Sequence, residues 1–381
     1  MNGAKATAGI FYYLGIVLVC APFMRRNLLY LPLLFLFAWG VKRGAEYLSA
    51  DERVSRLREK TDSFVLRRRH IFVALLAAGA LLLPHCSSGY VVEIVTAAFL
   101  YAILATALNI TVGLTGVLVL GFIGFYAIGA YVTGMLTAKF ALCNFWVALP
   151  LSGLTAMLFG ILLGIPTLRL KGDYLAIVTL GFGEIVKIFL NNLDSLTGGP
   201  NGILGIRRPG FGFFTTDGPI AFYYMAFCFL AATIFILARI IDSRFGRAWV
   251  AVRENEMAAG ALGIDVFRKH LLSFSVSAFF AGIAGSLYAA KQGFISPDSF
   301  TFYESVLVLC MVVLGGLGNI AGSVLGAFLL IVVPEFLREF ALYRMLIFGA
   351  VMIAFMIFRP HGILGSRTIT LEMEDARHGE E

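Results

Sequence analysis

Residues able to do chemistry concentrate in one stretch, residues 239–270, which reads RIIDSRFGRAWVAVRENEMAAGALGIDVFRKH. It combines cations, carboxylates and a histidine, and it lies between two long apolar runs. On charge alone, such a stretch is either a solvated connector or a surface on which a partner docks. Which of the two it is depends on the class of protein that contains it, which the rest of the sequence indicates.

Catalytic patterns are absent from the sequence. No lysine stands in the GxxxxGK[ST] context of a phosphate-binding loop, so the chain is not expected to use ATP by itself. GxSxG and HExxH are missing, and the five histidines and five cysteines form no ligand cluster. We therefore expect no catalytic residue, no metal site and no cofactor bound by this chain.

Apolar residues dominate the composition. They make up 59% of the 381 residues and charged residues 14%, whereas a soluble domain is about 25% charged. The net charge of +7 comes from cations in short connections between apolar runs rather than from a basic domain, which argues against nucleic-acid binding. These features predict an all-α polytopic membrane protein.

Apolar runs long enough to cross about 30 Å of hydrocarbon predict ten helices, near 70–84, 91–111, 116–138, 146–168, 173–192, 218–240, 271–291, 304–317, 322–337 and 344–358. Two shorter runs, 9–24 and 28–41, could form a hairpin or one bent element before them. We expect an N-terminal membrane hairpin and basic linker (1–69), a transmembrane core (70–362) and a flexible tail (363–381).

Basic residues in the connections predict the orientation. Residues 42–69 hold nine Lys or Arg and five Asp or Glu, and the connection at 241–270 is basic too. Because cytoplasmic loops carry an excess of Lys and Arg, we place both of these segments and both termini in the cytoplasm. Arg207 and Arg208 then fall outside, where a soluble acidic partner or lipid headgroups could explain them.

Two further segments could serve transport. Glycines in the run 109–131 would break the helix or let helices pack closely, and a break buried in protein can line a pathway; they are Gly113, Gly116, Gly121, Gly124 and Gly129. Glu184 is the second candidate for the pathway, because an ionisable group inside a membrane is costly. Lys187, three residues later, could neutralise it as a structural pair.

The centre of the charged stretch favours a helix over residues 246–262. Gly263 is a plausible helix stop and Asp265 a cap for the next segment. Small residues at 258–261 would let another surface approach closely.

Several of these segments, in order, resemble the inner-membrane permeases of ABC importers, specifically the M-type subunit for branched-chain amino acids. The resemblance covers about residues 91–362 and includes 113–131, 169–184, 197–203, 253–263 and 315–327. It implies a ten-helix permease core in the bacterial inner membrane. It also implies a cytoplasmic coupling segment for the ATPase, carried here by Arg253, Glu254, Glu256, Ala258, Ala259, Gly260 and Gly263.

The resemblance implies partners as well. A second permease subunit of the H type, two cytoplasmic ATPase subunits that use the ATP, and a periplasmic substrate-binding protein would complete the importer. The binding protein would dock near Arg207 and Arg208.

One departure weakens the link to a branched-chain substrate. The chain has Val117, Val119 and Phe122 where the family usually has polar residues, and Gly260 where many relatives carry a charge. A related amide or another small solute is therefore an alternative substrate. An ion-coupled secondary transporter is a less favoured alternative, since it needs titratable groups at mid-membrane and has only Glu184 with Lys187.

Overall fold

The computed structural model describes residues 80–85, 87–170, 172–206, 208–211, 214–215, 218–336, 349, 362 and 363. The N-terminal hairpin, the basic linker, the tail beyond residue 363 and nearly all of the predicted helix 344–358 lie outside the described residues. The chain divides into two units, and all the elements below belong to the unit formed by Ser87–Phe340 and Met352–Glu381.

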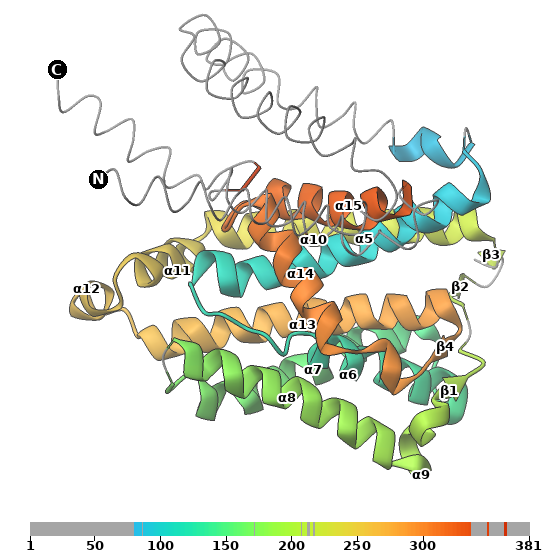
Figure 1. Cartoon of the computed structure of the whole chain (residues 1–381), viewed down its shortest axis with the longest axis horizontal. Coiled ribbons are helices and arrows are strands. Elements are labelled where there is room, and N and C mark those ends of the chain that lie inside the picture. Colours follow the sequence, from blue (N-terminus) through green and yellow to red (C-terminus); the bar gives the residue numbers. More distant parts are fainter. Residues whose placement is uncertain are drawn as a thin grey trace, which may run out of the picture. The chain divides into compact units, whose positions relative to one another are not determined.

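Helices dominate the described residues (Figure 1). Within the part of the chain that the structure describes, five helical segments are long and apolar enough to cross a membrane. The long helices are α5 (Gly89–Asn109), α6 (Ile123–Gly134), α7 (Phe145–Thr167), α8 (Asp173–Asn192), α10 (Pro219–Asp242), α13 (Val266–Gln292), α14 (Phe302–Gly315) and α15 (Ile320–Phe336). Short π-helical turns extend α5 (η2, Ile110–Leu114) and α6 (η3, Met135–Lys139).

Most predicted helices match the observed ones within a few residues, so the all-α polytopic class is confirmed. The predicted start of the third helix at residue 116 is wrong, because residues 115–122 are not helical and α6 begins at Ile123. Gly116 has a φ of +73°, a left-handed conformation that side chains disfavour. The apolar run there is therefore a partly buried irregular segment followed by a short helix.

α13 is the central helix of this unit, and it packs against α5, α6 and α7. Glycines bring the backbones together: a Cβ at Gly129 of α6 would overlap the backbone of Gly282 on α13, and one at Gly285 would overlap the carbonyl of Tyr126. Such close approach is typical of membrane helix packing, where dispersion contacts and small residues replace the hydrophobic effect.

Two small sheets lie at the end opposite α12 (Figure 1). β1 (Ile203–Leu204) pairs antiparallel with β4 (Phe294–Ile295), and β2 (Gly210–Phe211) with β3 (Phe214–Thr215). The turn-rich segment before β1 contains α9 (Asp194–Thr197) and the 3₁₀ turn η4 (Gly199–Asn201). Positive φ at Gly198, Gly199 and Gly202 explains its glycines. A second 3₁₀ turn, η5 (Pro297–Ser299), precedes α14.

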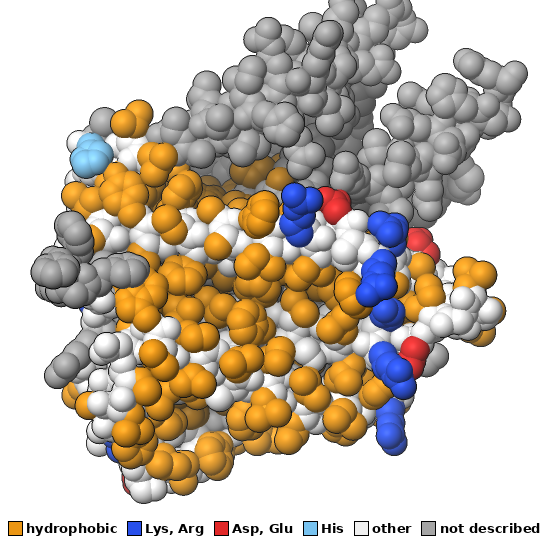
Figure 2. Space-filling model, turned by 180° about the vertical axis from the view of Figure 1, so that it is seen from behind, with side chains coloured by type: hydrophobic (Ala, Val, Ile, Leu, Met, Phe, Trp, Pro, Cys, Tyr) orange, Lys and Arg blue, Asp and Glu red, His pale blue; other side chains and the backbone are white. Residues whose placement is uncertain are grey.

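Much of the surface is apolar. Exposed side chains of α7 and α8 include Leu158, Leu162, Ile177 and Ile185. Figure 2 shows such side chains over much of one face, with Lys and Arg gathered at the side where α11 and α12 lie. An apolar face bordered by cations fits a protein that crosses a membrane.

Candidate functional site

The charged stretch folds into two short helices at one end of the unit, α11 (Arg244–Glu254) and α12 (Glu256–Ala261) (Figure 1). The predicted single helix 246–262 is therefore wrong. Asn255 interrupts it with extended backbone, and its side chain caps α12 by accepting a hydrogen bond from the Ala258 N–H at 3.0 Å. Both predicted boundary residues are confirmed: Gly263 has a φ of +83° and Asp265 caps α13.

The exposed face of α12 has the properties of a docking surface. Met257 and Leu262 are 83% and 82% exposed, a high value for large apolar side chains. Ala258 is exposed and a Cβ on Gly260 would enter open space, whereas Ala259 is buried and holds the helix to the rest of the protein. The small-residue segment is therefore divided between an inner and an outer face.

Glu256 fixes α12 to α13. Its Oε1 lies 3.3 Å from Nε2 of His270, whose ring is buried. His270 closes the charged stretch, but no pattern in the sequence singles it out, because a lone histidine in an apolar helix has no recognisable spacing. The carboxylate is thus both partly exposed and part of the internal packing.

Arg253 points inward rather than toward the exposed face. Its Nη1 donates a hydrogen bond to the carbonyl oxygen of Gly113, at the end of η2. Glu254, the next residue, is exposed. Of these two predicted coupling residues, Glu254 is exposed and Arg253 is partly buried.

The glycine run divides into a break and a set of packing contacts. The predicted helix break near Gly113 and Gly116 is confirmed, since α5 passes through the π-turn η2 into irregular backbone. A Cβ on Gly121 would overlap the Thr179 carbonyl of α8, and one on Gly124 would lie 3.0 Å from the Phe182 ring. Gly121, Gly124 and Gly129 thus allow close packing, and a role of any of these glycines in a pathway stays a prediction.

Glu184 lies partly buried on α8. The expected pair with Lys187 is not formed, because the Lys187 Nζ lies 3.7 Å from Oδ1 of Asp298 in η5. Glu184 therefore stays a pathway prediction without the neutralising partner that the sequence suggested.

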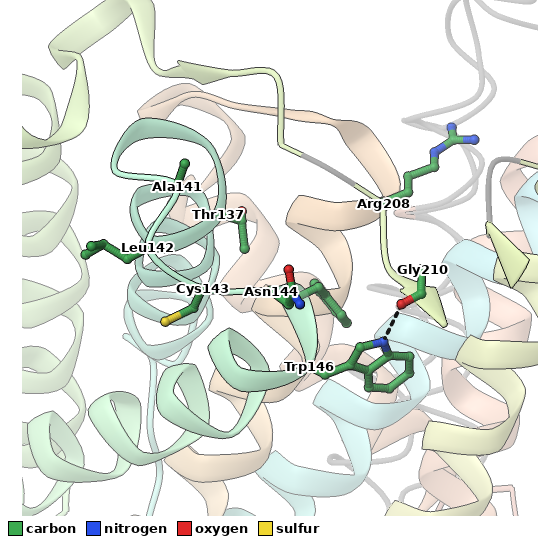
Figure 3. Close-up of a pocket in the computed structure, with 9 residues that line it drawn as sticks. Thr137, Ala141, Leu142, Cys143, Asn144, Trp146, Arg208 and Gly210 are labelled. Atoms are coloured by element: carbon green, nitrogen blue, oxygen red, sulfur yellow. Dashed lines mark hydrogen bonds between the residues drawn. The ribbon is translucent and has the colours of Figure 1, made fainter. Parts of the chain in front are cut away.

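The opposite end of the unit carries a cavity of about 470 Å³ (Figure 3). It lies where η3 leads into α7, and the Trp146 indole donates a hydrogen bond to the Gly210 carbonyl at 3.1 Å. Arg208 borders this cavity, and its exposed side chain extends away from the other labelled residues. Arg207 lies outside the described residues.

The three apolar replacements occupy two different environments. Val119 and Phe122 are buried, and Phe122 packs edge-on against Phe125 with ring centroids 6.2 Å apart. Val117 instead lines a cavity of about 350 Å³ beside Glu256 and His270. Two of the changes therefore serve packing, and one makes a cavity wall more apolar.

Comparison with known proteins identifies the family of the chain. Residues 90–356 match the family described as the branched-chain amino acid transport system permease component. The chain belongs to this family. The permease is 43% identical to the high-affinity branched-chain amino acid transport system permease protein LivM of Escherichia coli K12, over 84% of its own length and 80% of that protein. The LivM protein of Salmonella typhimurium LT2 is 44% identical over 78% and 75% of the two chains.

More distant relatives show the breadth of the family. The LivH permease protein of Escherichia coli K12 is 28% identical, over 71% of the permease and 93% of that protein. The autoinducer 2 import system permease protein LsrC of Klebsiella pneumoniae is 28% identical over 46% and 50%. No solved structure matches the permease. With its membrane-spanning helices, the permease is a multi-pass membrane transport subunit.

Proposed function

We propose that the permease forms the membrane pathway of an ATP-driven importer for branched-chain or related hydrophobic amino acids. The observation that carries the substrate class is the 43% identity to LivM of Escherichia coli over 84% of the chain. The permease has no ATPase site in this proposal; it converts the motion of ATPase partners into alternating access.

The proposed partners correspond to separate surfaces. Two ATPase subunits dock on the coupling segments of the two permease subunits. The one that docks on this chain contacts the exposed side of α12, where Met257 and Leu262 supply apolar contact area. A second permease subunit of the H type completes the pathway, as the separate LivM and LivH relatives suggest. A periplasmic binding protein docks near Arg208, which an acidic surface would complement. We place the permease in the bacterial inner membrane, with both termini and α11–α12 on the cytoplasmic side. This orientation follows from the excess of Lys and Arg that cytoplasmic loops carry.

The test is uptake of labelled leucine by cells that lack their own system and express the permease with its ATPase, H-type and binding-protein partners. Uptake should stop when ATP is depleted and should persist with a protonophore while ATP is maintained. Uptake that survives ATP depletion but collapses with the protonophore would favour the ion-coupled alternative.

A second substrate class has its own support. LsrC, a relative whose name specifies another solute, matches part of the chain, and Val117, Val119 and Phe122 replace the polar residues usual in the family. Competition by unlabelled amides and by polar amino acids, compared with leucine, isoleucine and valine, separates these alternatives. If only an amide inhibits leucine uptake, the substrate is an amide rather than a branched-chain amino acid.

A further inference from the structure

Arg253 occupies a junction between three segments that are distant in sequence. Its Nη1 donates to the Gly113 carbonyl at the end of η2. Its Cγ lies 3.4 Å from where a Cβ of Gly116 would stand, and Nη1 lies 3.4 Å from the equivalent point at Gly318. The side chain thus lies against the break after α5 and against the turn between α14 and α15.

Asn109 joins the same two segments through a second contact. Its buried Oδ1 accepts a hydrogen bond of 2.8 Å from the backbone N–H of Gly318. A Cβ on Gly113 would overlap both Asn109 Oδ1 and the Gly318 nitrogen, so only glycine fits between them. The break and the turn are therefore in direct backbone contact.

We propose that Arg253 and Asn109 form a linkage that transmits movement of α11–α12 to the break after α5 and to the α14–α15 turn. This inference rests on the proposed function, since it assumes that the ATPases move α12. In this arrangement Arg253 is a positioning residue for the pathway, whereas the exposed side of α12 receives the ATPase.

The position of the Gly113 carbonyl at the end of a helix explains why its hydrogen bond to Arg253 would persist while α11–α12 move. α5 and η2 form one continuous helical segment, Gly89–Leu114, and the last carbonyls of a helix lack partners within it and carry partial negative charge. A guanidinium bound there forms a charge-assisted hydrogen bond, which is stronger than a neutral one. Breaking it would leave a partly buried guanidinium N–H without its acceptor, which costs free energy. Arg253 and the end of the helix should therefore move together.

The first test compares two arginines of the same helix in the complete transporter reconstituted into proteoliposomes. Arg247 is exposed and bonds only locally in the described structure, from Nη1 to the Asp242 carbonyl at 3.1 Å. Arg253→Ala should lower the leucine transported per ATP hydrolysed on the order of tenfold, the factor that a hydrogen bond to a charged group is worth. Arg247→Ala should leave this ratio unchanged. An unchanged ratio in Arg253→Ala would overturn the linkage.

A double-mutant cycle tests whether the two residues act together. Asn109→Ala should also lower the leucine transported per ATP hydrolysed. The double variant with Arg253→Ala should lower this ratio little further, because the effects of substitutions within one network are not additive. Arg253→Lys, which keeps the charge but loses the planar fork, should recover part of the ratio. A merely structural role would lower the amount of assembled complex without changing the ratio. Independent, multiplying effects would contradict a shared linkage.

A third measurement separates failure of the linkage from failure of the substrate assignment. Spin labels on cysteines introduced at the exposed residues Ala321 and Leu142, in a permease without its own cysteines, report movement of the α14–α15 turn. Adding ATP to the complete transporter, with no substrate present, should change the distance between the labels. Arg253→Ala should abolish this change. If the unaltered permease shows no ATP-dependent change, the linkage is wrong, whichever solute the importer carries.

Discussion

Gly113 occupies a position where the packing leaves no room for a side chain. It lies between Asn109 and the backbone of Gly318, and no side chain fits there. Its carbonyl is at the same time the acceptor for Arg253. One glycine thus combines close backbone approach with a contact to the charged segment, and a substitution should affect both.

Gly113→Ala should lower the stability of the purified permease by roughly 1–3 kcal/mol, the usual cost of overpacking. The matched control is Gly260→Ala, where the added methyl group enters open space on α12. Thermal unfolding in detergent measures both variants, and the control should be unchanged or slightly more stable, because Ala is the better helix former. Equal melting temperatures for Gly113→Ala and the unaltered chain would contradict the packing described here.

At the scale of elements, α12 is held by a few specific contacts rather than by a large apolar face. Asn255 caps its start, Ala259 is its buried residue, and Glu256 contacts His270. The turn at Gly263 then leads into α13, the central helix of the unit. Movement of α12 should therefore displace α13 directly.

Glu256→Ala and Gly263→Ala should each reduce transport per ATP while the membrane subunits still assemble. Glu256→Ala removes the contact with His270, and Gly263→Ala places a side chain at a φ of +83°, at a cost of about 1–2 kcal/mol. The control is Arg268→Ala, which loses a surface ion pair with Asp265 (2.9 Å) worth about 0–1 kcal/mol. Uptake and ATP hydrolysis are measured together. Normal uptake in both test variants would refute their role in coupling.

At the scale of the whole molecule, the two surfaces proposed to bind partners lie at opposite ends of the bundle. The basic segment α11–α12 lies at one end, and the short strands with Arg208 lie at the other, with apolar helices between them (Figures 1 and 2). An importer needs this separation, because its ATPases and its binding protein act from opposite sides of the membrane.

Arg208→Glu should weaken the stimulation of ATPase activity by the binding protein, most strongly at low salt, since the expected contact is between exposed charges. Arg239→Glu makes the same charge change at an exposed position in the last turn of α10, near the opposite end, and should leave stimulation by the binding protein intact. ATPase activity is titrated with binding protein at two salt concentrations. Unchanged stimulation in Arg208→Glu would favour a contact with lipid headgroups instead.

The sequence by itself determined the membrane class, most helix positions, the break near Gly113 and the boundaries at Gly263 and Asp265. These depend on hydropathy, helix length and local backbone preferences, which act over a few residues. Only the tertiary structure decided that Lys187 pairs with Asp298, that Arg253 binds the Gly113 carbonyl, and that Asn109 meets Gly318. Those contacts join residues up to 209 positions apart, and such pairings depend on which helix faces meet, which no local pattern encodes.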